Sequence, residues 1–138
     1  MTGEYRHGID AKGRLFVPAK LREDLGTVFY LTIAPDNCLS AYSSESWDAF
    51  LEKFKTLPQT KKQKIRALFA FAAKCELDSQ GRIVVPQKLR DYAGLTKDVS
   101  IIGVGDHAEI WDAAAWAKKE AEEITPENIA AAMDELEF

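Results

Sequence analysis

The chain has 138 residues, of which 46% are hydrophobic and 29% are charged, a balance that excludes a disordered chain and indicates a folded, water-soluble protein. No apolar run approaches the roughly 20 residues that cross a bilayer, and the N-terminal sequence MTGEYRHGID lacks the apolar stretch of a signal peptide, so we expect a cytoplasmic protein. The net charge of −4 argues against a nucleic-acid partner if it is evenly spread, because neutralising phosphates is the largest sequence-independent term in such binding.

The first clear elements lie in DAKGRLFVPAKLREDLG, from Asp10 to Gly26. After an initial strand, Asp10 can accept backbone N–H bonds in a tight turn, and Gly13 supplies the positive φ that closes a hairpin with a bulge. The run RLFV predicts a buried strand, and Pro18 suits the first turn of the helix AKLREDL. Gly26 is expected to end that helix as a left-handed C-cap.

A second hairpin and a closing helix are predicted next. The hairpin runs over residues 28–42 with its turn near Asp36-Asn37, a pair of residues that tolerates a left-handed turn. Ser43 or Ser44 then caps the closing helix.

The connector LPQTKKQKIRALFAFAAK follows, in which Pro58 breaks the chain and Thr60 can cap a helix that reaches about Ala73. Residues 53–66 contain no acidic side chain and six basic ones, namely Lys53, Lys55, Lys61, Lys62, Lys64 and Arg66. Local fields decide where a polyanion binds, so this segment is either a solvated helix face or a patch that follows phosphates.

The elements then recur. Residues 78–94, DSQGRIVVPQKLRDYAG, match residues 10–26 at a constant offset of 68, with nine of 17 positions identical. A weaker match continues beyond them, with Trp111 and Trp116 aligned to Tyr42 and Trp47. The second copy repeats the hairpin over 99–111 around Gly105-Asp106, and Asp112 caps its closing helix. Two copies of one unit therefore account for most of the chain.

The C-terminal segment is acidic. Thr125 is the expected N-cap and Pro126 the first residue of a short helix, in ITPENIAAAMDELEF. Residues 112–138 hold two Lys and eight Asp or Glu, whereas residues 1–111 carry 16 basic against 14 acidic groups. The negative charge is therefore concentrated at one end, and a polyanionic partner remains compatible with the rest.

We predict a β-rich α+β fold. A unit of about 45 residues rarely buries enough apolar surface to fold alone, so each copy needs a partner. We expect the strands of the two copies to interleave about one pseudo-two-fold axis, with both glycine-closed turns on one side. The expected division is a first domain at 5–47, a helical connector at 48–75, a second domain at 76–119 and an acidic C-terminal helix at 120–138.

Arg14 and Arg82 are the strongest candidates for nucleic-acid contacts. The spacing DxxxR puts each guanidinium just beyond a turn, beside the carboxylate of Asp10 or Asp78 that organises it. A planar group with five donors suits phosphates and guanine edges, and a two-stranded ribbon is narrow enough to enter the major groove. The alternative is that each Arg forms a salt bridge to its own Asp and only pins the hairpin.

The two turn tips differ in charge. The first tip is Ala11-Lys12 and the second is Ser79-Gln80. Since only the first tip is cationic, we expect Lys12 with Arg14 to make the stronger contact. Four helix cations either add phosphate contacts or form a solvated face: Lys20, Arg22, Lys88 and Arg90.

The remaining candidates favour structural roles. Cys38 and Cys75 lie in apolar surroundings without CxxC spacing, which favours buried thiols over a disulfide or zinc site. His7 and His107 have no ligand at metal-binding spacing, so no metal or cofactor is expected. The chain has no Gly-rich phosphate loop, GxSxG or HExxH motif, so neither an enzyme nor a small-molecule substrate is expected. Three tryptophans have the spacing of residues that lie in a core or in a contact between subunits: Trp47, Trp111 and Trp116.

At DAKGRLFVPAKLRE and DSQGRIVVPQKLRD, preceded by GEYRHGID and followed by DNCLSAYSSESW, the chain resembles the MraZ family of bacterial transcriptional regulators over residues 3–118. The resemblance implies two SpoVT-AbrB-like swapped-hairpin domains pairing into a barrel, a ring-shaped homo-oligomer and binding to short direct repeats in double-stranded DNA. The promoter in that family is typically the protein's own, ahead of the division and cell-wall gene cluster, and the usual action is repression. The DNA-contacting motif then falls on Asp10 and Arg14, and on Asp78 and Arg82.

A ring would reconcile DNA binding with the acidic total, because many subunits share one DNA face and linked sites raise avidity. Such a protein would be associated with the nucleoid. Two other functions stay open. One is a non-catalytic oligomeric scaffold or protein-interaction module. The other is an antitoxin-type regulator of the same fold class, which a neighbouring toxin gene and a disordered C-terminal tail would support.

Overall fold

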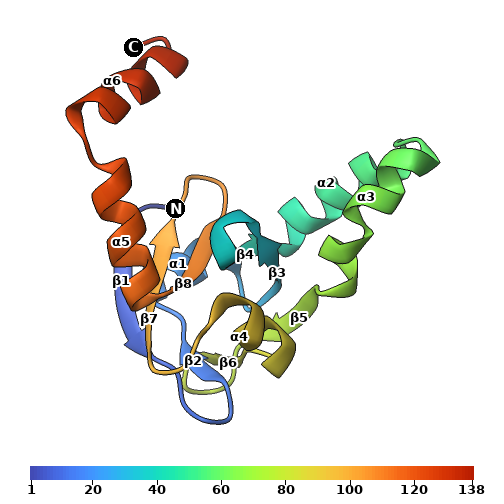
Figure 1. The fold of residues 1–138 in the computed structure, drawn as a ribbon. Coiled ribbons are helices and arrows are strands. Elements are labelled where there is room, and N and C mark those ends of the chain that lie inside the picture. The colour runs from blue at the N-terminus through green and yellow to red at the C-terminus, as the bar shows by residue number, and fades with distance from the viewer.

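The protein is an α+β structure, seen here in a computed structural model that describes residues 1–138 (Figure 1). The first copy contains β1 (Glu4–Gly8), β2 (Arg14–Phe16), α1 (Ala19–Leu25), β3 (Val28–Ala34), a 3-10 turn (Pro35–Asn37), β4 (Cys38–Ser43) and α2 (Ser44–Lys55). The second copy, reached through α3 (Gln59–Ala70), contains β5 (Ala73–Glu76), β6 (Arg82–Val84), α4 (Gln87–Ala93), β7 (Asp98–Gly103), β8 (Ala108–Asp112) and α5 (Ala113–Glu123). The chain ends with α6 (Pro126–Glu135). Helices occupy more residues than strands, so the fold is less β-rich than predicted, because the connecting, closing and C-terminal helices are long.

The strands of the two copies are interleaved in one antiparallel sheet. Its order is β1-β7-β8-β4-β3-β5, so β1 pairs with a strand of the second copy and β5 with a strand of the first. The order reads the same from either end when the two copies are exchanged, which confirms the predicted interleaving. The edge strands β1 and β5 do not pair with each other, so the sheet is not closed and the predicted pseudo-two-fold barrel is not confirmed.

The strands that follow the two DxxxR turns form a separate ribbon. In it β2 and β6 run antiparallel, with Leu15 opposite Ile83 at the centre. The ribbon is extended symmetrically by two backbone bonds, from the Val17 N–H to the Gly81 oxygen at 2.9 Å and from the Val85 N–H to the Gly13 oxygen at 2.8 Å. Each copy therefore contributes the partner strand that the other lacks.

One hydrophobic core lies beneath the ribbon and the sheet. Its 19 buried residues come from both copies, including Leu15 and Ile83 from the ribbon and Leu21 and Leu89 from the short helices α1 and α4. Because neither copy holds a complete set of core residues, the two fold as one unit. None of the helices is both long and apolar enough to span a bilayer.

Most predicted helix caps are confirmed. The side chains of Ser43, Asp112 and Thr125 accept bonds from the backbone N–H groups three residues on, at 3.0–3.2 Å. Gly94 adopts the left-handed conformation predicted for it (φ 64°, ψ 32°). Gly26 does not, because its φ of 82° comes with a ψ of −172°, which extends the chain directly into β3.

The predicted connector helix was wrong at both ends. Pro58 stands at the N-cap position, so Thr60 lies inside α3 and caps nothing. The helix stops at Ala70 because residues 73–76 form β5, in which Cys75 pairs with Phe29 of β3. Strand pairing with the first copy, which local sequence does not reveal, ends the helix early.

Candidate nucleic-acid interface

The two DxxxR turns have the same hydrogen-bond geometry. Asp10 accepts the backbone N–H groups of Lys12 and Arg14 on Oδ1, at 3.0 and 2.9 Å, and the Arg14 Nε on Oδ2 at 2.5 Å. Asp78 accepts Gln80 and Arg82 in the same way, at 2.8 and 2.9 Å, and the Arg82 Nε at 2.9 Å. Each carboxylate therefore fixes both the shape of its turn and the direction of its arginine.

The arginines keep these carboxylates ionised. The Arg14 backbone N–H, followed by its guanidinium, lowers the pKa of Asp10, and the Arg82 backbone N–H does the same for Asp78. Each salt bridge uses Nε, which leaves both Nη groups free of bonds within the chain. The salt bridges expected if each Arg only pins its own turn are therefore present. They use Nε alone, so the Nη groups remain able to donate to a guanine or a phosphate.

Both arginines point outward from one ribbon. Paired residues of an antiparallel ladder share a face, and successive residues alternate between faces. Leu15 and Ile83 are buried, so the outward face carries Arg14 opposite Val84 and Phe16 opposite Arg82. The two arginines are diagonal neighbours, which sit about 7–8 Å apart in such ladders. At the bottom of Figure 1, β2 and β6 lie away from α2, α3 and α6.

Val84 and Phe16 are members of this surface that the sequence prediction missed. Val84 is 59% exposed although it lies in a strand of the ribbon. The alternation of side chains along RLFV and RIVV could have identified them. Because Leu15 and Ile83 face the core, the residues on either side of each must face away from it.

The helix arginines lie under the turns and do not form a solvated face. Arg90 of α4 donates from Nε to the Val85 oxygen at 2.9 Å and from Nη1 to the Ala11 oxygen at 3.2 Å. Arg22 of α1 lies 5.4 Å from the Phe16 ring centre and packs against Gly81. Each arginine thus contacts the turn of the opposite copy.

The helix lysines are placed differently. Lys20 is exposed on α1, whereas the Lys88 ammonium lies 4.0 Å from the centre of the Phe71 ring. Lys12 is exposed at the first turn tip, where the second turn has the neutral Gln80. The tips therefore differ in charge as the sequence indicates.

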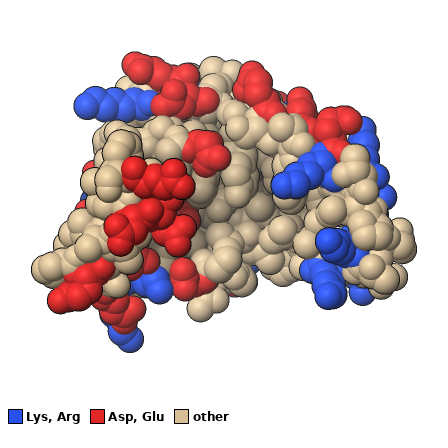
Figure 2. Space-filling model, turned by 90° about the horizontal axis from the view of Figure 1, so that it is seen from above, with Lys and Arg blue, Asp and Glu red and all other residues tan.

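The basic segment 53–66 is not brought to the ribbon. It lies on α2 and α3, which project to the upper right in Figure 1, while β2 and β6 lie at the bottom. Figure 2, which looks down from above, shows Lys and Arg mainly at the right, with a few at the upper left and lower left, and most Asp and Glu at the left and along the upper rim. Cations are thus most numerous on the side of this view away from the main group of carboxylates.

The cysteines are buried and do not reach the ribbon's outward face, whereas His7 borders this face through Phe16. Cys38 and Cys75 are free and buried as predicted, and burial raises the pKa of each thiol to about 12. The His7 ring packs against Phe16 with 5.0 Å between ring centres, and His107 Nδ1 lies 2.8 Å from the carboxylate of Asp106. No group of three His, Cys, Asp or Glu side chains is arranged to hold a metal ion.

The sequence pattern of one known family matches the chain twice. This family is described as "MraZ protein, putative antitoxin-like", and its pattern covers residues 1–70 and 68–136, with one DxxxR turn in each match. The chain belongs to the MraZ family. The two matches meet at the end of α3, just before β5.

Curated relatives of this MraZ chain are similar over nearly its whole length. A protein of Acetivibrio thermocellus is 50% identical over 95% of this chain and 94% of its own length. One of Caldicellulosiruptor bescii is 46% identical over 99% and 98%, and one of Heliobacterium modesticaldum is 50% identical over 84% and 83%. All three are named "Transcriptional regulator MraZ".

Proposed function

We propose that this protein is a sequence-specific DNA-binding transcriptional regulator that represses the promoter of its own division and cell-wall gene cluster by binding short direct repeats. The observation that carries the proposal is the outward face of the β2–β6 ribbon, where Arg14 and Arg82 stand as diagonal neighbours with their Nη groups free. Its relatives are named as transcriptional regulators, which supports the same function.

The ribbon suits the major groove of double-stranded DNA, which admits a two-stranded β-ribbon. A guanidinium can bind guanine O6 and N7 with two donors, and exposed Val84 can contact a thymine methyl group. Asp10 and Asp78 hold the arginines in place before DNA arrives, which reduces the entropy lost on binding. Lys12 adds a cation at the first tip, and Lys20 is placed on the exposed side of α1 for a phosphate contact.

Arg22 has a supporting role in this proposal. Its guanidinium packs on Phe16 and against Gly81, so it holds the second turn in place and contributes positive charge beneath it. Arg90 has the same role under the first turn. Each of these two arginines supports a turn that carries a proposed DNA contact and does not itself contact DNA.

We further propose that each chain forms two SpoVT-AbrB-like units, at 5–47 and 76–119, that pair into a pseudo-two-fold barrel-like body. Residues 48–75 connect the units and residues 120–138 form the acidic C-terminal part. Several chains form a ring that presents repeated ribbons to repeated DNA sites, which raises avidity by effective concentration. The assembly works in the cytoplasm, associated with the nucleoid, and needs neither a cofactor nor catalysis.

The test is a gel-shift titration of the full-length protein on its own upstream DNA at two salt concentrations. Arg14→Ala is expected to abolish the shift, since each two-donor contact contributes about 1–3 kcal/mol, and Arg82→Ala is expected to weaken it by a smaller factor. Lys64→Ala on α3 is the control, because it removes the same charge far from the ribbon. A larger loss for Arg82→Ala would refute the assignment of the two turns. Unchanged affinity in the double variant would overturn the function.

An oligomeric scaffold is the second candidate, favoured by the exposed apolar residues of α6, such as Ile129 and Leu136. It predicts no sequence-dependent shift in the same titration. The antitoxin-type alternative predicts a disordered tail, whereas residues 113–123 and 126–135 form helices here.

A further inference from the structure

The helix α6 carries an apolar face that nothing in its own chain covers. Every residue from Pro126 to Phe138 is exposed, and α6 points away from the body at the upper left of Figure 1. Ile129, Met133 and Leu136 are 52%, 46% and 66% exposed, and their spacing of four and three residues puts them on one face. Such i, i+4, i+7 anchors are the pattern of a helix that docks in a groove.

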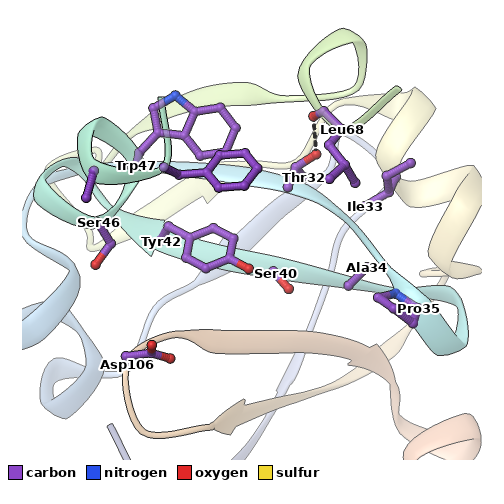
Figure 3. Close-up of a pocket in the computed structure, with 12 residues that line it drawn as sticks. Thr32, Ile33, Ala34, Pro35, Ser40, Tyr42, Ser46, Trp47, Leu68 and Asp106 are labelled. Atoms are coloured by element: carbon purple, nitrogen blue, oxygen red, sulfur yellow. Dashed lines mark hydrogen bonds between the residues drawn. The ribbon is translucent and has the colours of Figure 1, made fainter. Parts of the chain in front are cut away.

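An apolar groove lies in the body of the molecule, and none of its lining residues belongs to α6. It has a volume of about 410 Å³ and opens between α2, β3, β4 and the turn that joins β7 to β8. Figure 3 shows Trp47 and Tyr42 along one wall and Asp106 across from them. Phe50 and Leu68 add to the apolar lining. Asp106 is the single charged residue that lines the groove, and its carboxylate lies beside His107 Nδ1.

The charges around the two surfaces are complementary. Residues 120–138 hold seven acidic side chains and no basic one, namely Glu120, Glu122, Glu123, Glu127, Asp134, Glu135 and Glu137. The helices α2 and α3 beside the groove carry the six cations of residues 53–66 against three acidic side chains of α2, Glu45, Asp48 and Glu52, so the two helices together have a net charge of +3. In Figure 2 most cations lie at the right, next to a further group of carboxylates along the upper right rim, and the other carboxylates lie mainly at the left.

We propose that α6 of one subunit docks its apolar face in the groove beside α2 of the next subunit. The occupant is a second copy, because α6 points away from the body of its own chain (Figure 1) and leaves that chain's groove uncovered, while its acidic charge complements the net positive charge of α2 and α3. Two different surfaces joined head to tail give a ring when the rotation closes. This inference rests on the proposed function only in assuming a homo-oligomer, and it identifies the contact between subunits that would build that oligomer.

Cross-linking tests the contact in the full-length chain. Met133→Cys and Ala49→Cys are placed in separate, differently tagged chains that are co-expressed and mildly oxidised; Ala49 is exposed and lines the groove. The native thiols are buried. A disulfide between the two tagged chains is expected. Ala131→Cys is the matched control, because position 131 lies on the opposite face of α6 and is expected to give at least about tenfold less product. Equal yields from positions 131 and 133, or no product, would overturn the proposal.

A charge placed on the apolar face gives a second readout. Met133→Glu is expected to lower the oligomer mass measured by light scattering, whereas Ala131→Glu is expected to leave it unchanged, and helix content stays equal because both side chains are exposed. An unchanged mass for Met133→Glu would overturn the docking while leaving Arg14-dependent DNA binding intact. Wild-type protein that cross-links but shows no sequence-dependent DNA shift would overturn the function and support the docking.

Discussion

The Arg90 guanidinium donates from Nη1 to the main-chain oxygen of Ala11, 3.2 Å away and 79 residues earlier in the chain. Its Nε donates to the Val85 oxygen at 2.9 Å, and Val85 in turn donates its N–H to Gly13. One side chain of the second copy therefore supports the turn that carries Lys12 and Arg14 in the first. The DxxxR turn of one copy, which is the proposed DNA contact, therefore depends on the other copy for its shape.

Removing this support should weaken DNA binding without removing a DNA contact. Arg90→Ala leaves two carbonyl oxygens without their partner, a loss of about 1–3 kcal/mol of unfolding free energy, and we expect operator affinity to fall roughly tenfold, which corresponds to 1.4 kcal/mol. Thermal unfolding and gel-shift titration measure the two effects. Lys88→Ala is the matched control, since it removes the same charge from the same helix. Equal reductions of affinity in both variants would show that charge, not support of the turn, is responsible.

Three glycines with positive φ should respond differently to alanine. A Cβ on Gly13 would lie 2.5 Å from the Val85 oxygen, a backbone atom that cannot move aside, whereas on Gly81 it would meet the flexible end of Arg22 at 2.8 Å. A Cβ on Gly94 meets nothing within 4 Å. We expect Gly94→Ala to cost about 1 kcal/mol from its left-handed backbone alone, Gly81→Ala more, and Gly13→Ala the most. Chemical denaturation of the three variants checks this order, and equal destabilisation would contradict the close approach at Gly13.

The repeat made the central architecture predictable from sequence. The constant offset between residues 10–26 and 78–94, with the core argument for pairing, indicated interleaved copies, and the strand order shows them. The Asp, Gly and Arg positions also predicted the hydrogen bonds of both turns. These features are local, or repeated, and therefore visible in one sequence. The hairpins predicted around these two turns were wrong, because the strands on either side of each turn pair with strands of the other copy.

Long-range features were not predictable in the same way. The early end of α3 depends on β5 pairing with β3, and the inward course of Arg22 and Arg90 depends on turns that lie far away in the chain. The sequence of a two-turn helix identifies a basic side chain but not the distant backbone or ring that this side chain contacts. The separation of the basic segment 53–66 from the ribbon likewise follows from how α2 and α3 leave the sheet.

Salt dependence should report the charge at the first turn tip. Lys12 is exposed beside Arg14, so Lys12→Ala should lower the slope of log affinity against log salt by about 0.9 for each DNA phosphate that the side chain no longer neutralises. Lys12→Arg should preserve the slope. Gln80→Lys, which gives the second tip the missing charge, should raise it. A slope that is the same in all three variants would place the tips outside the DNA interface.

The two thiols should be unreactive in the folded protein. Burial raises the pKa of Cys38 and Cys75 to about 12, and only the thiolate reacts with a disulfide reagent, so labelling at pH 8 should be at least about 100-fold slower than for a free cysteine of pKa near 8.5. Unfolding in guanidinium chloride should restore full reactivity at both positions. Rapid labelling of either thiol in native protein would contradict the buried positions on β4 and β5.

The first copy should not fold alone. A fragment of residues 1–60 lacks β5, β6, β7 and β8, so β1 and β2 are left without a partner strand and β3 and β4 each keep only one. It also lacks ten of the 19 core residues, all those from Cys75 to Ile110, and a unit of that size rarely folds without a partner. We expect an unfolded chain by circular dichroism, or a self-associated one in which a second fragment takes the place of the missing copy, since the ribbon register puts the equivalent residues Leu15 and Ile83 opposite each other. Residues 1–123, which lack only α6, are the control and should fold. A stable, monomeric 1–60 fragment, measured by light scattering, would contradict the dependence of each copy on the other.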